Sequence, residues 1–389
     1  MFTSLTALAL TAPAVHLTLQ IAGLSPLIGI DTTLETTPLP HRLTLEDYGW
    51  GPHFQQQLTP EDGDALPVRV VMVHRDALDV AGPSFEGRIA GFTQRDRGNS
   101  ATTGDWMLIN ASRRALRLLD RHSVFKRKSA GRGRSVQMIA ANVDILFVVT
   151  SANQEFNLAR IERYLALAAE AGATPVVLIT KADLSEDVTP FVEAVQELLP
   201  SLAVQAINAR NADVGAQLAP WLARGKTLAL LGSSGVGKST LVNSLMGQLL
   251  QATQGSRVGG DKGRHTTSAR SLHRLANGAW LMDTPGIREL QLLDVAQGVD
   301  EVFDDLVALA ATCKFSNCTH LNEPGCAVQG AVTAGEVDDL RLMRYQKLQG
   351  EEQSNSQAIS GSKTRAKVSG RMPKRIFNEK RKEQDDGRT

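Results

Sequence analysis

The sequence of 389 residues predicts a multidomain protein with an N-terminal antiparallel β-barrel, a central α/β domain and a small C-terminal domain with helices. Three observations support this division. Short apolar segments alternate with Gly, Asp and Asn turns between residues 68 and 119. A glycine-rich loop stands between an apolar run and a helical pattern near residue 232. All three cysteines lie between residues 313 and 326, and a chain of this length is expected to hold two or three domains.

The predicted barrel covers residues 61–135 and is of the OB type. Its strands are expected at Val68–Val73, Phe85–Phe92, Trp106–Asn110 and Ala115–Leu119. An OB-fold would place basic and aromatic side chains along a strand face that binds RNA. The candidates are Phe92, Trp106, Phe125, Arg113, Arg114, Lys126 and Arg127. A small β-domain with a solvated basic face is the alternative.

Residues 1–60 form an extension that we expect to be partly disordered. The first 41 residues contain no Lys or Arg, so no positive region precedes the apolar segment Ala7–Ala14, and a signal peptide is not expected. No apolar stretch approaches 18 residues, which argues against a membrane span. The sequence therefore predicts a cytoplasmic protein that does not bind a membrane.

Charge is distributed unevenly along the chain. Residues 85–134 hold 12 Lys and Arg against 4 Asp and Glu, and residues 361–389 hold 10 against 4, although the net charge of the whole chain is +1. Two basic segments on an otherwise acidic chain suggest a polyanionic partner. Residues 351–389 are rich in Lys, Arg, Ser and Gln and almost devoid of apolar side chains, so we expect a basic disordered tail.

The glycine-rich loop is a P-loop, which indicates a nucleotide-binding site. It comprises Gly232, Ser233, Ser234, Gly235, Val236, Gly237, Lys238, Ser239 and Thr240. The apolar run 227–231 precedes it and a helical pattern follows, which is the context that such a loop requires. Backbone N–H groups of the loop and of the helix N-terminus would bind phosphate oxygens. Lys238 would reach the β- and γ-phosphates, and Ser239 would bind Mg²⁺.

A second loop predicts the base that is bound. The apolar segment 175–179 leads into Thr180, Lys181, Ala182 and Asp183. The Asp183 carboxylate can accept two hydrogen bonds from guanine, whereas adenine would leave it unpaired. Thr180 stands where the usual motif has Asn, so a hydroxyl replaces an amide. Asn208 and Ala209 form a weaker candidate base loop. The alternative is an ordinary turn in which Asp183 caps a helix.

Downstream segments have the features of nucleotide-dependent switches. Thr266 or Thr267 would close over the Mg²⁺ ion, Asp283 would bind the ion through water, and the Gly286 N–H would contact the γ-phosphate. Ile287 stands where many GTPases carry a water-orienting Gln. His265 is therefore the candidate catalytic residue, since an imidazole can orient or deprotonate water; the alternative is an exposed loop histidine.

These motifs occur in an order that differs from that of ordinary GTPases. The base loop comes first and is followed by the P-loop and the switches, which describes a circularly permuted GTPase domain. We assign this domain to residues 136–295. Val136–Thr150 is expected to open its sheet, and Asn157–Ala171 reads as an amphipathic helix.

The cysteines predict a metal site within a domain at residues 296–350. Cys313, Cys318, His320 and Cys326 supply three thiolates and one imidazole, which complete a tetrahedral structural zinc shell. An odd number of cysteines in one cluster argues against a disulfide framework. The alternative is a set of reduced buried thiols beside a surface histidine, and iron could occupy the same shell in vitro.

Taken together, the motifs from Thr180 to Cys326 resemble those of the ribosome small-subunit-dependent GTPase A family, from about Leu45 to Tyr345. The resemblance implies a bacterial GTPase that acts late in small-subunit maturation. It would bind the 30S particle and 16S rRNA through its OB and zinc domains, and the particle would stimulate hydrolysis. The family motif also supports His265 as the hydrolytic residue. We expect a monomer.

Two other functions remain open from the sequence. Because Ile287 cannot orient water, the chain could be an RNA-binding assembly factor for which GTP is only a conformational ligand. It could also be a permuted GTPase of 50S assembly.

Overall fold

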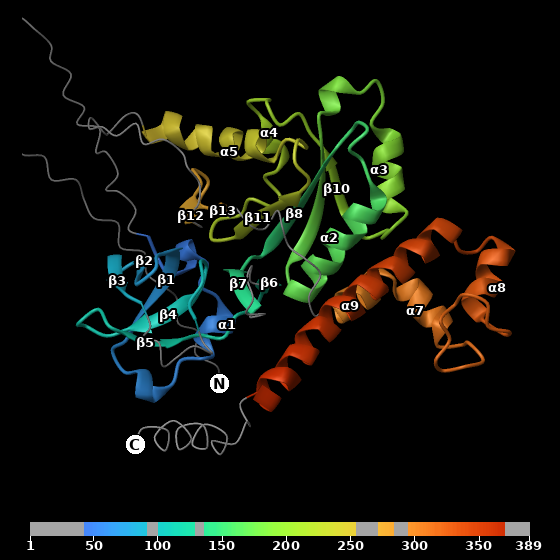
Figure 1. Ribbon diagram of the computed structural model, residues 1–389. Coiled ribbons are helices and arrows are strands. Elements are labelled where there is room, and N and C mark those ends of the chain that lie inside the picture. Colours follow the sequence, from blue (N-terminus) through green and yellow to red (C-terminus); the bar gives the residue numbers. More distant parts are fainter. Residues whose placement is uncertain (1–42, 92–99, 129–135, 254–270, 284–294, 370–389) are drawn as a thin grey trace, which may run out of the picture. The chain divides into compact units, whose positions relative to one another are not determined.

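The computed structural model describes residues 43–91, 100–128, 136–253, 271–283 and 295–369 (Figure 1). The predicted sites His265, Thr266, Thr267, Gly286 and Ile287, the aromatic residue Phe92 and most of the N-terminal extension lie outside these residues. Within the described residues, no helix is both long and apolar enough to cross a membrane.

The N-terminal part is an antiparallel sheet with three short helical turns before it. The turns are η1 (Glu46–Tyr48), α1 (Pro52–Gln55) and η2 (Pro60–Asp62). The strands are β1 (Leu66–Val73), β2 (Ala77–Ala81), β3 (Glu86–Ala90), β4 (Trp106–Ile109) and β5 (Ala115–Leu118). Strand β1 pairs with both β2 and β4, while β3 and β5 extend the set at its two ends. Among the described residues β3 and β5 are not paired with each other, so closure into an OB-type barrel remains a prediction.

The predicted aromatic RNA-binding face is wrong for two of its members. Trp106 is 0% exposed and Phe125 is 2% exposed, so neither can stack on a base. Trp106 contacts the rings of Trp50 and Phe54, at centroid distances of 4.9 and 5.7 Å. Burial of the apolar area of these rings stabilises the core, and exposure on an RNA-binding face would forgo that stabilisation. The basic candidates Arg113, Arg114 and Lys126 are exposed, and Arg127 is partly exposed.

The segment Val136–Thr150, which was expected to open the central sheet, forms two strands, of which only the second belongs to that sheet. Strand β7 (Val136–Ala141) pairs with β6 (Val124–Lys128) in a separate two-stranded sheet, and β8 (Ile145–Ser151) belongs to the main sheet. Asn142 breaks the segment with a left-handed φ of 56°. Its side chain compensates by donating to the Gly104 carbonyl at 3.0 Å and accepting from the His122 N–H at 3.1 Å. Asparagine tolerates this conformation better than most residues.

The central part alternates strands and helices. After β8 come α2 (Leu158–Ala171), β9 (Thr174–Thr180), η4 (Ala182–Leu184), α3 (Thr189–Gln196), β10 (Ala203–Ala206) and α4 (Val214–Gln217). They are followed by β11 (Thr227–Gly232), α5 (Lys238–Thr253), β12 (Ser271–Arg274) and β13 (Trp280–Asp283). The helix predicted at Asn157–Ala171 is confirmed as α2. Asn157 is its N-cap and accepts from the Arg160 N–H at 3.0 Å.

One sheet joins the N-terminal and central parts. Its order is β10-β9-β8-β11-β13-β12-β1-β2-β3, and the first five strands are parallel. Strand β12 pairs antiparallel with β13 and meets β1 at Met72 and Ser271. Apolar side chains cover both faces of the parallel strands, in two separate buried clusters, as parallel sheets require.

Arg69 fills the junction between these parts and is 1% exposed. Its guanidinium donates to the Tyr48 carbonyl at 2.6 Å, the Thr227 hydroxyl at 2.6 Å and the Asn142 carbonyl at 3.2 Å. Burial lowers the pKa of Arg69 to about 10, and the charges of Asp144 and Asp105 act in the opposite direction. The side chain therefore satisfies polar groups from both parts of the sheet.

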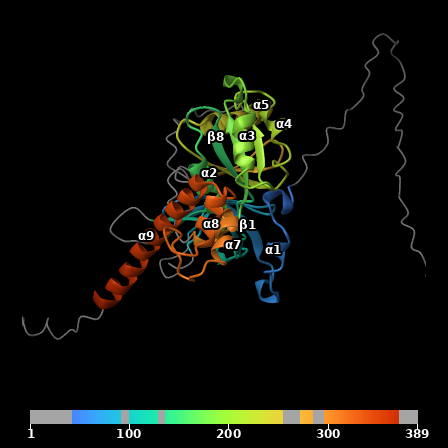
Figure 2. The same cartoon turned by 90° about the vertical axis from the view of Figure 1, so that its right-hand side faces the viewer.

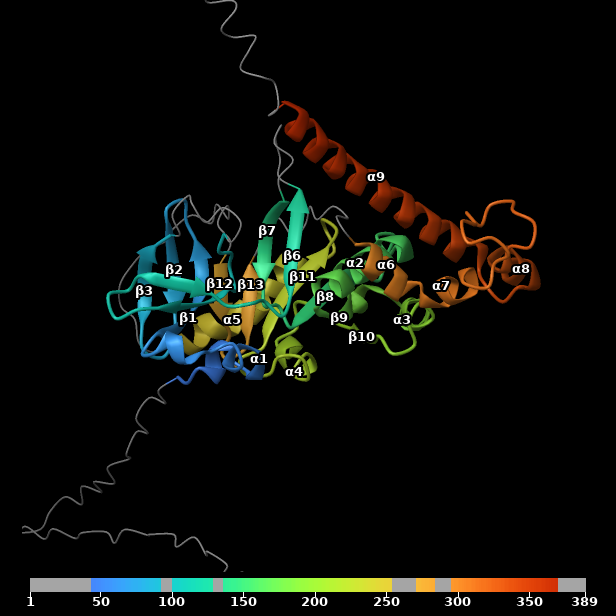
Figure 3. The same cartoon turned by 90° about the horizontal axis from the view of Figure 1, so that it is seen from below.

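The C-terminal part consists of helices α6 (Ala296–Val302), α7 (Asp304–Ala310), α8 (Ala327–Ala334) and α9 (Asp339–Ser369). Helix α6 packs against α2, as Figure 3 shows, and against α9. Helix α7 packs against α8 (Figures 2 and 3). Helix α9 continues past Glu351 to Ser369, into the stretch for which a basic disordered tail was expected. Low apolar content shows that a segment cannot build a core, but it does not prevent extension of a helix that has already formed.

Candidate functional site

Three of the predicted loops, and the residue Asp283, lie at one edge of the parallel sheet. Strands β9, β10, β11 and β13 run in the same direction and end near Thr180, Ala206, Gly232 and Asp283. The base loops follow the neighbouring strands β9 and β10, and the P-loop follows β11, which β8 separates from β9. Ligands of open α/β sheets bind outside these carboxyl ends.

The P-loop begins directly at the end of β11, because Gly232 is both the last residue of the strand and the first of the loop. A Cβ on Gly232 would lie 2.2 Å from the Val149 carbonyl oxygen of β8, so no larger residue fits there. Gly237 has a φ of 95°, which favours glycine. The Lys238 Nζ donates to the Gly232 carbonyl at 2.8 Å and also to the Ser233 carbonyl. Lys238 begins α5, and its amine therefore lies against the first two residues of the loop.

Thr180 connects the base loop to the P-loop. Its buried hydroxyl lies 2.5 Å from the Val236 carbonyl in the P-loop and 3.0 Å from the Thr150 carbonyl. The Thr180 hydroxyl thus connects the base loop to the P-loop, in place of the Asn amide that the usual motif carries at this position. Lys181 has a left-handed φ of 58°, and Asp183 is exposed at the adjacent turn.

The second base loop is attached to both neighbours. The Ala182 N–H donates to the Ile207 carbonyl at 3.3 Å, which joins the two base loops. The Ser244 hydroxyl of α5 donates to the Ala209 carbonyl at 2.7 Å. Asn208 bends its own loop by accepting from the Arg210 N–H at 2.9 Å. Both base loops and the P-loop therefore form one hydrogen-bonded unit.

Two functional candidates on α2 were missed by sequence reasoning. Arg160 donates from its NH1 to the Ser233 hydroxyl in the P-loop. Glu162 is 0% exposed and accepts from Arg344 of α9 at 2.7 Å. Burial raises the pKa of Glu162, while Arg344 and Arg341 act to lower it. The only signal in the sequence is a glutamate beside Ile161, on the apolar side of an otherwise regular amphipathic helix.

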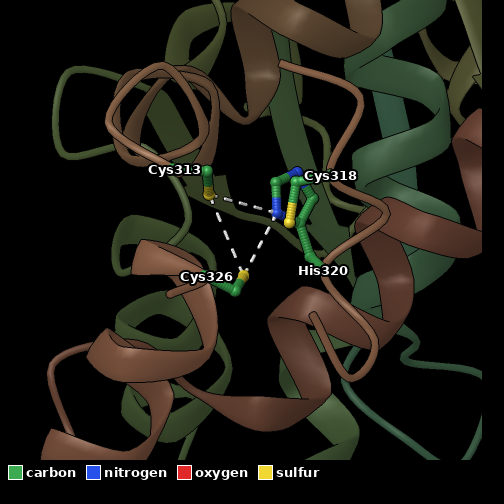
Figure 4. Close-up of side chains that lie close together, drawn as sticks. All are labelled: Cys313, Cys318, His320 and Cys326. Atoms are coloured by element: carbon green, nitrogen blue, oxygen red, sulfur yellow. Dashed lines mark hydrogen bonds between the residues drawn. The ribbon is translucent and has the colours of Figure 1, made fainter. Parts of the chain in front are cut away.

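The three cysteines and one histidine form a compact cluster, here called the Cys₃His cluster (Figure 4). Their ligand atoms all lie within 4.8 Å of one another. The Cys313 Sγ is 3.9 Å from the Cys326 Sγ, and the His320 Nδ1 is 3.6 and 3.5 Å from these two sulfurs. A tetrahedral zinc ion has S–S edges of about 3.8 Å and S–N edges of about 3.6 Å, from its bond lengths. The cluster therefore fits such an ion, and the sulfur separation excludes a disulfide.

Neighbouring groups hold this cluster in shape. The Ala327 and Gln329 N–H groups, at the start of α8, point at the Cys313 and Cys326 sulfurs, at 3.3 and 3.4 Å. The Glu323 carboxylate accepts from the N–H groups of residues 319, 321 and 322 at 2.9, 3.0 and 3.2 Å. The Thr319 hydroxyl and these backbone groups lower the pKa of Glu323 to about 2. Nothing in the sequence pattern marks Glu323 for this role.

Comparison with known proteins gives consistent matches. The family model described as RsgA GTPase matches residues 118–293. A relative from Mesorhizobium japonicum, named small ribosomal subunit biogenesis GTPase RsgA, is 46% identical over 336 residues, which is 85% of this chain and 96% of the relative. A relative from Vibrio parahaemolyticus, named small ribosomal subunit biogenesis GTPase RsgA 2, is 44% identical over 341 residues, or 87% of this chain and 94% of the relative.

Solved structures show the same fold. YjeQ from Thermotoga maritima aligns with a TM-score of 0.55 and 25% identity, covering 73% of this chain and 97% of that chain. YloQ, described as a circularly permuted GTPase, aligns with a TM-score of 0.54 and 23% identity, covering 77% of this chain and 99% of that chain. The permuted order of motifs predicted from the sequence thus has a structural counterpart.

Proposed function

The chain belongs to the RsgA GTPase family, and we propose that it hydrolyses GTP to GDP and phosphate on the small ribosomal subunit, in the late maturation of that particle. One observation supports the site assignment most directly. The Thr180 hydroxyl contacts the P-loop at Val236, which holds the base loop and the phosphate loop side by side.

The base end of the proposed pocket is formed by Thr180, Lys181, Ala182 and Asp183, together with Asn208 and Ala209. The Asp183 carboxylate would accept from guanine N1 and N2, while the Lys181 stem lies along the base plane. Asp183 is exposed at its turn, as a group that binds a ligand must be. A guanine nucleotide satisfies this carboxylate and an adenine nucleotide does not.

The phosphate end is formed by the P-loop, from Gly232 to Thr240. Backbone N–H groups at the start of α5 would bind the phosphates, and the Lys238 amine would move from the loop carbonyls to the β- and γ-phosphates. Ser239, Thr266 or Thr267, and Asp283 would hold Mg²⁺, which neutralises charge that develops on the phosphates when it is bound. Gly286 would contact the γ-phosphate, and His265 would orient the attacking water.

The small subunit and 16S rRNA are the proposed partners. Arg113, Arg114 and Lys126 offer exposed positive charge on the proposed OB domain, and charge of this kind binds RNA phosphates. The Cys₃His cluster would hold one structural Zn²⁺, because its four groups leave no position for a reacting water. We further propose a cytoplasmic monomer, with domains at 61–135, 136–295 and 296–350.

Phosphate release, measured with and without 30S particles, tests this function. We expect strong stimulation by 30S and none by 50S. Stimulation by 50S alone would assign the protein to large-subunit assembly, and no stimulation by either particle would contradict the proposal. Lys238→Ala should abolish nucleotide binding, so unchanged GTP affinity would refute the P-loop assignment. Asp183→Asn should shift preference from guanine to xanthine nucleotides, and retained GTP preference would refute the base-loop assignment.

A further inference from the structure

Two cationic side chains from different elements meet at one P-loop residue. The Lys238 amine donates to the Ser233 carbonyl, and the Arg160 guanidinium donates to the Ser233 hydroxyl. Lys238 begins α5, which follows β11, whereas Arg160 lies in the first turn of α2, which follows β8. Positive charge therefore gathers at the end of the loop where the β- and γ-phosphates of a nucleotide are bound.

Arg160 is only weakly neutralised by its surroundings. Among the described residues its one acidic neighbour is Glu155, with a closest distance of 3.7 Å. Both side chains are substantially exposed, at 38% for Arg160 and 51% for Glu155. An exposed pair at this separation contributes little and is exchanged readily for a stronger anion. A phosphate group is such an anion, because a guanidinium can bind it through two parallel hydrogen bonds.

The position of Arg160 is held by the backbone rather than by the ion pair. Asn157 caps α2 through the Arg160 N–H, and the cap fixes where the arginine stem leaves the helix. The next residue, Ile161, is 2% exposed and anchors the same turn in the core. The guanidinium therefore reaches the P-loop from a rigid element, which keeps its loss of conformational freedom on binding small.

We propose that Arg160 is a phosphate-binding residue of the GTP site, whose guanidinium donates to the terminal phosphate of GTP. This inference rests on the proposed GTP site. On binding, the guanidinium shifts from the Ser233 hydroxyl to phosphate oxygens, and Lys238 neutralises the same region from the other side. GDP lacks the terminal phosphate, so Arg160 discriminates between the two nucleotides. It also stabilises charge that develops on this phosphate during hydrolysis, as arginines supplied within the same chain do in other GTPases.

The test compares Arg160→Gln with the wild-type full-length protein. Equilibrium binding of fluorescent GTP and GDP analogues gives the ratio of the two affinities, and single-turnover phosphate release at saturating GTP gives the hydrolysis rate. We expect Arg160→Gln to weaken GTP binding about tenfold, to change GDP binding by less than about twofold, and to slow hydrolysis at least about tenfold. The GTP affinity and hydrolysis rate of Arg160→Lys should fall between those of the wild type and those of Arg160→Gln, because lysine keeps the charge but lacks the paired donors.

Three further variants make the result decisive. Arg163→Gln alters the same helix one turn further on, where Arg163 pairs with Glu351 and not with the P-loop, so both affinities should stay at the wild-type level. Ser233→Ala removes the hydroxyl but keeps the guanidinium, so the GTP-to-GDP affinity ratio should stay that of the wild type. Lys238→Ala reports on the P-loop itself.

The outcomes separate the two proposals. If Arg160→Gln lowers both affinities equally, or reproduces Ser233→Ala, Arg160 only shapes the loop and the inference is overturned. If Lys238→Ala binds GTP as the wild type does, the proposed nucleotide site is wrong instead. Thermal unfolding followed by circular dichroism checks that Arg160→Gln is folded. If it is misfolded, Arg160→Lys is tested instead. An unchanged ratio of GTP to GDP affinity in Arg160→Lys would then overturn the inference.

Discussion

Replacement of Glu162 should loosen the C-terminal helices from the central sheet. This carboxylate of α2 is 0% exposed and accepts hydrogen bonds from two residues of α9, from the Arg344 Nε at 2.7 Å and from the Arg341 NH1 at 3.4 Å. Arg344 and Arg341 are themselves only 16% and 12% exposed. Arg341 has a second carboxylate, Asp305, at 2.8 Å, whereas the nearest alternative for Arg344 is Asp338 at 3.9 Å.

The expected magnitude follows from this arrangement. Glu162→Ala leaves Arg344 buried without a close counter-charge, and loss of one member of a buried pair typically costs about 3–5 kcal/mol. Glu162→Gln keeps an oxygen acceptor but loses the charge, so we expect about 2 kcal/mol. Arg163→Gln is the matched control, since its pair with Glu351 is about one-third exposed on each side and should contribute at most about 1 kcal/mol.

Hydrogen exchange measured by mass spectrometry gives the free energy of opening for each segment. Glu162→Ala should lower this free energy for the α9 segment 339–350 while leaving strand β9 nearly unchanged. A double-mutant cycle of Glu162→Gln with Arg344→Gln should show a coupling of about 1 kcal/mol or more. A loss in α9 no larger than that of Arg163→Gln, or a coupling near zero, would refute the reasoning.

Three other perturbations have defined outcomes. Arg69→Met should lower the free energy of unfolding by at least about 3 kcal/mol, measured by urea denaturation, because buried carbonyls lose their charged donor; a loss below 1 kcal/mol would contradict this. Gly232→Ala should weaken GTP binding more than about tenfold, since its Cβ would lie 2.2 Å from the Val149 carbonyl oxygen, whereas Gly247→Ala in α5 meets open space and should bind GTP normally. The Glu323 carboxyl has a pKa of about 2 against an ordinary 4.5, so its stabilisation is complete above pH 4.5 and is lost as the pH falls toward 2. The difference in unfolding free energy between the wild type and Glu323→Gln should therefore shrink over that range, and a constant difference would oppose the assignment.

Local patterns predicted the elements that depend on short stretches of sequence. The apolar run before the P-loop and the helix after it are present as β11 and α5, because the turn chemistry and the periodicity are confined to about 20 residues. The cysteine cluster is also present as predicted, since close spacing of four ligands allows few other arrangements. The helix at Asn157–Ala171 could be predicted because its cap and its apolar face agree.

Long-range packing explains what the sequence could not show. Trp106 and Phe125 were expected on an RNA-binding face, but an aromatic ring in a short strand suits a core equally well, and only its neighbours decide. The break between β7 and β8 falls at Asn142, and a lone asparagine in a sequence does not predict a left-handed residue. Glu162 was missed because its partners lie about 180 residues away.

Helix α2 gives these separate findings a common physical basis. In a single turn it directs Arg160 to the P-loop, and Glu162 and Arg163 to α9. Hydrogen bonds weaken steeply with stretching, so a shift of α2 by about 1 Å would break either the 2.7 Å bond between Glu162 and Arg344 or the contact with Ser233, unless α9 moved as well. The helix also packs against α6, which makes movement of the two helices as one body less costly than sliding between them. Any displacement of Arg160 by a bound phosphate is thus opposed by, or passed on to, α6 and α9.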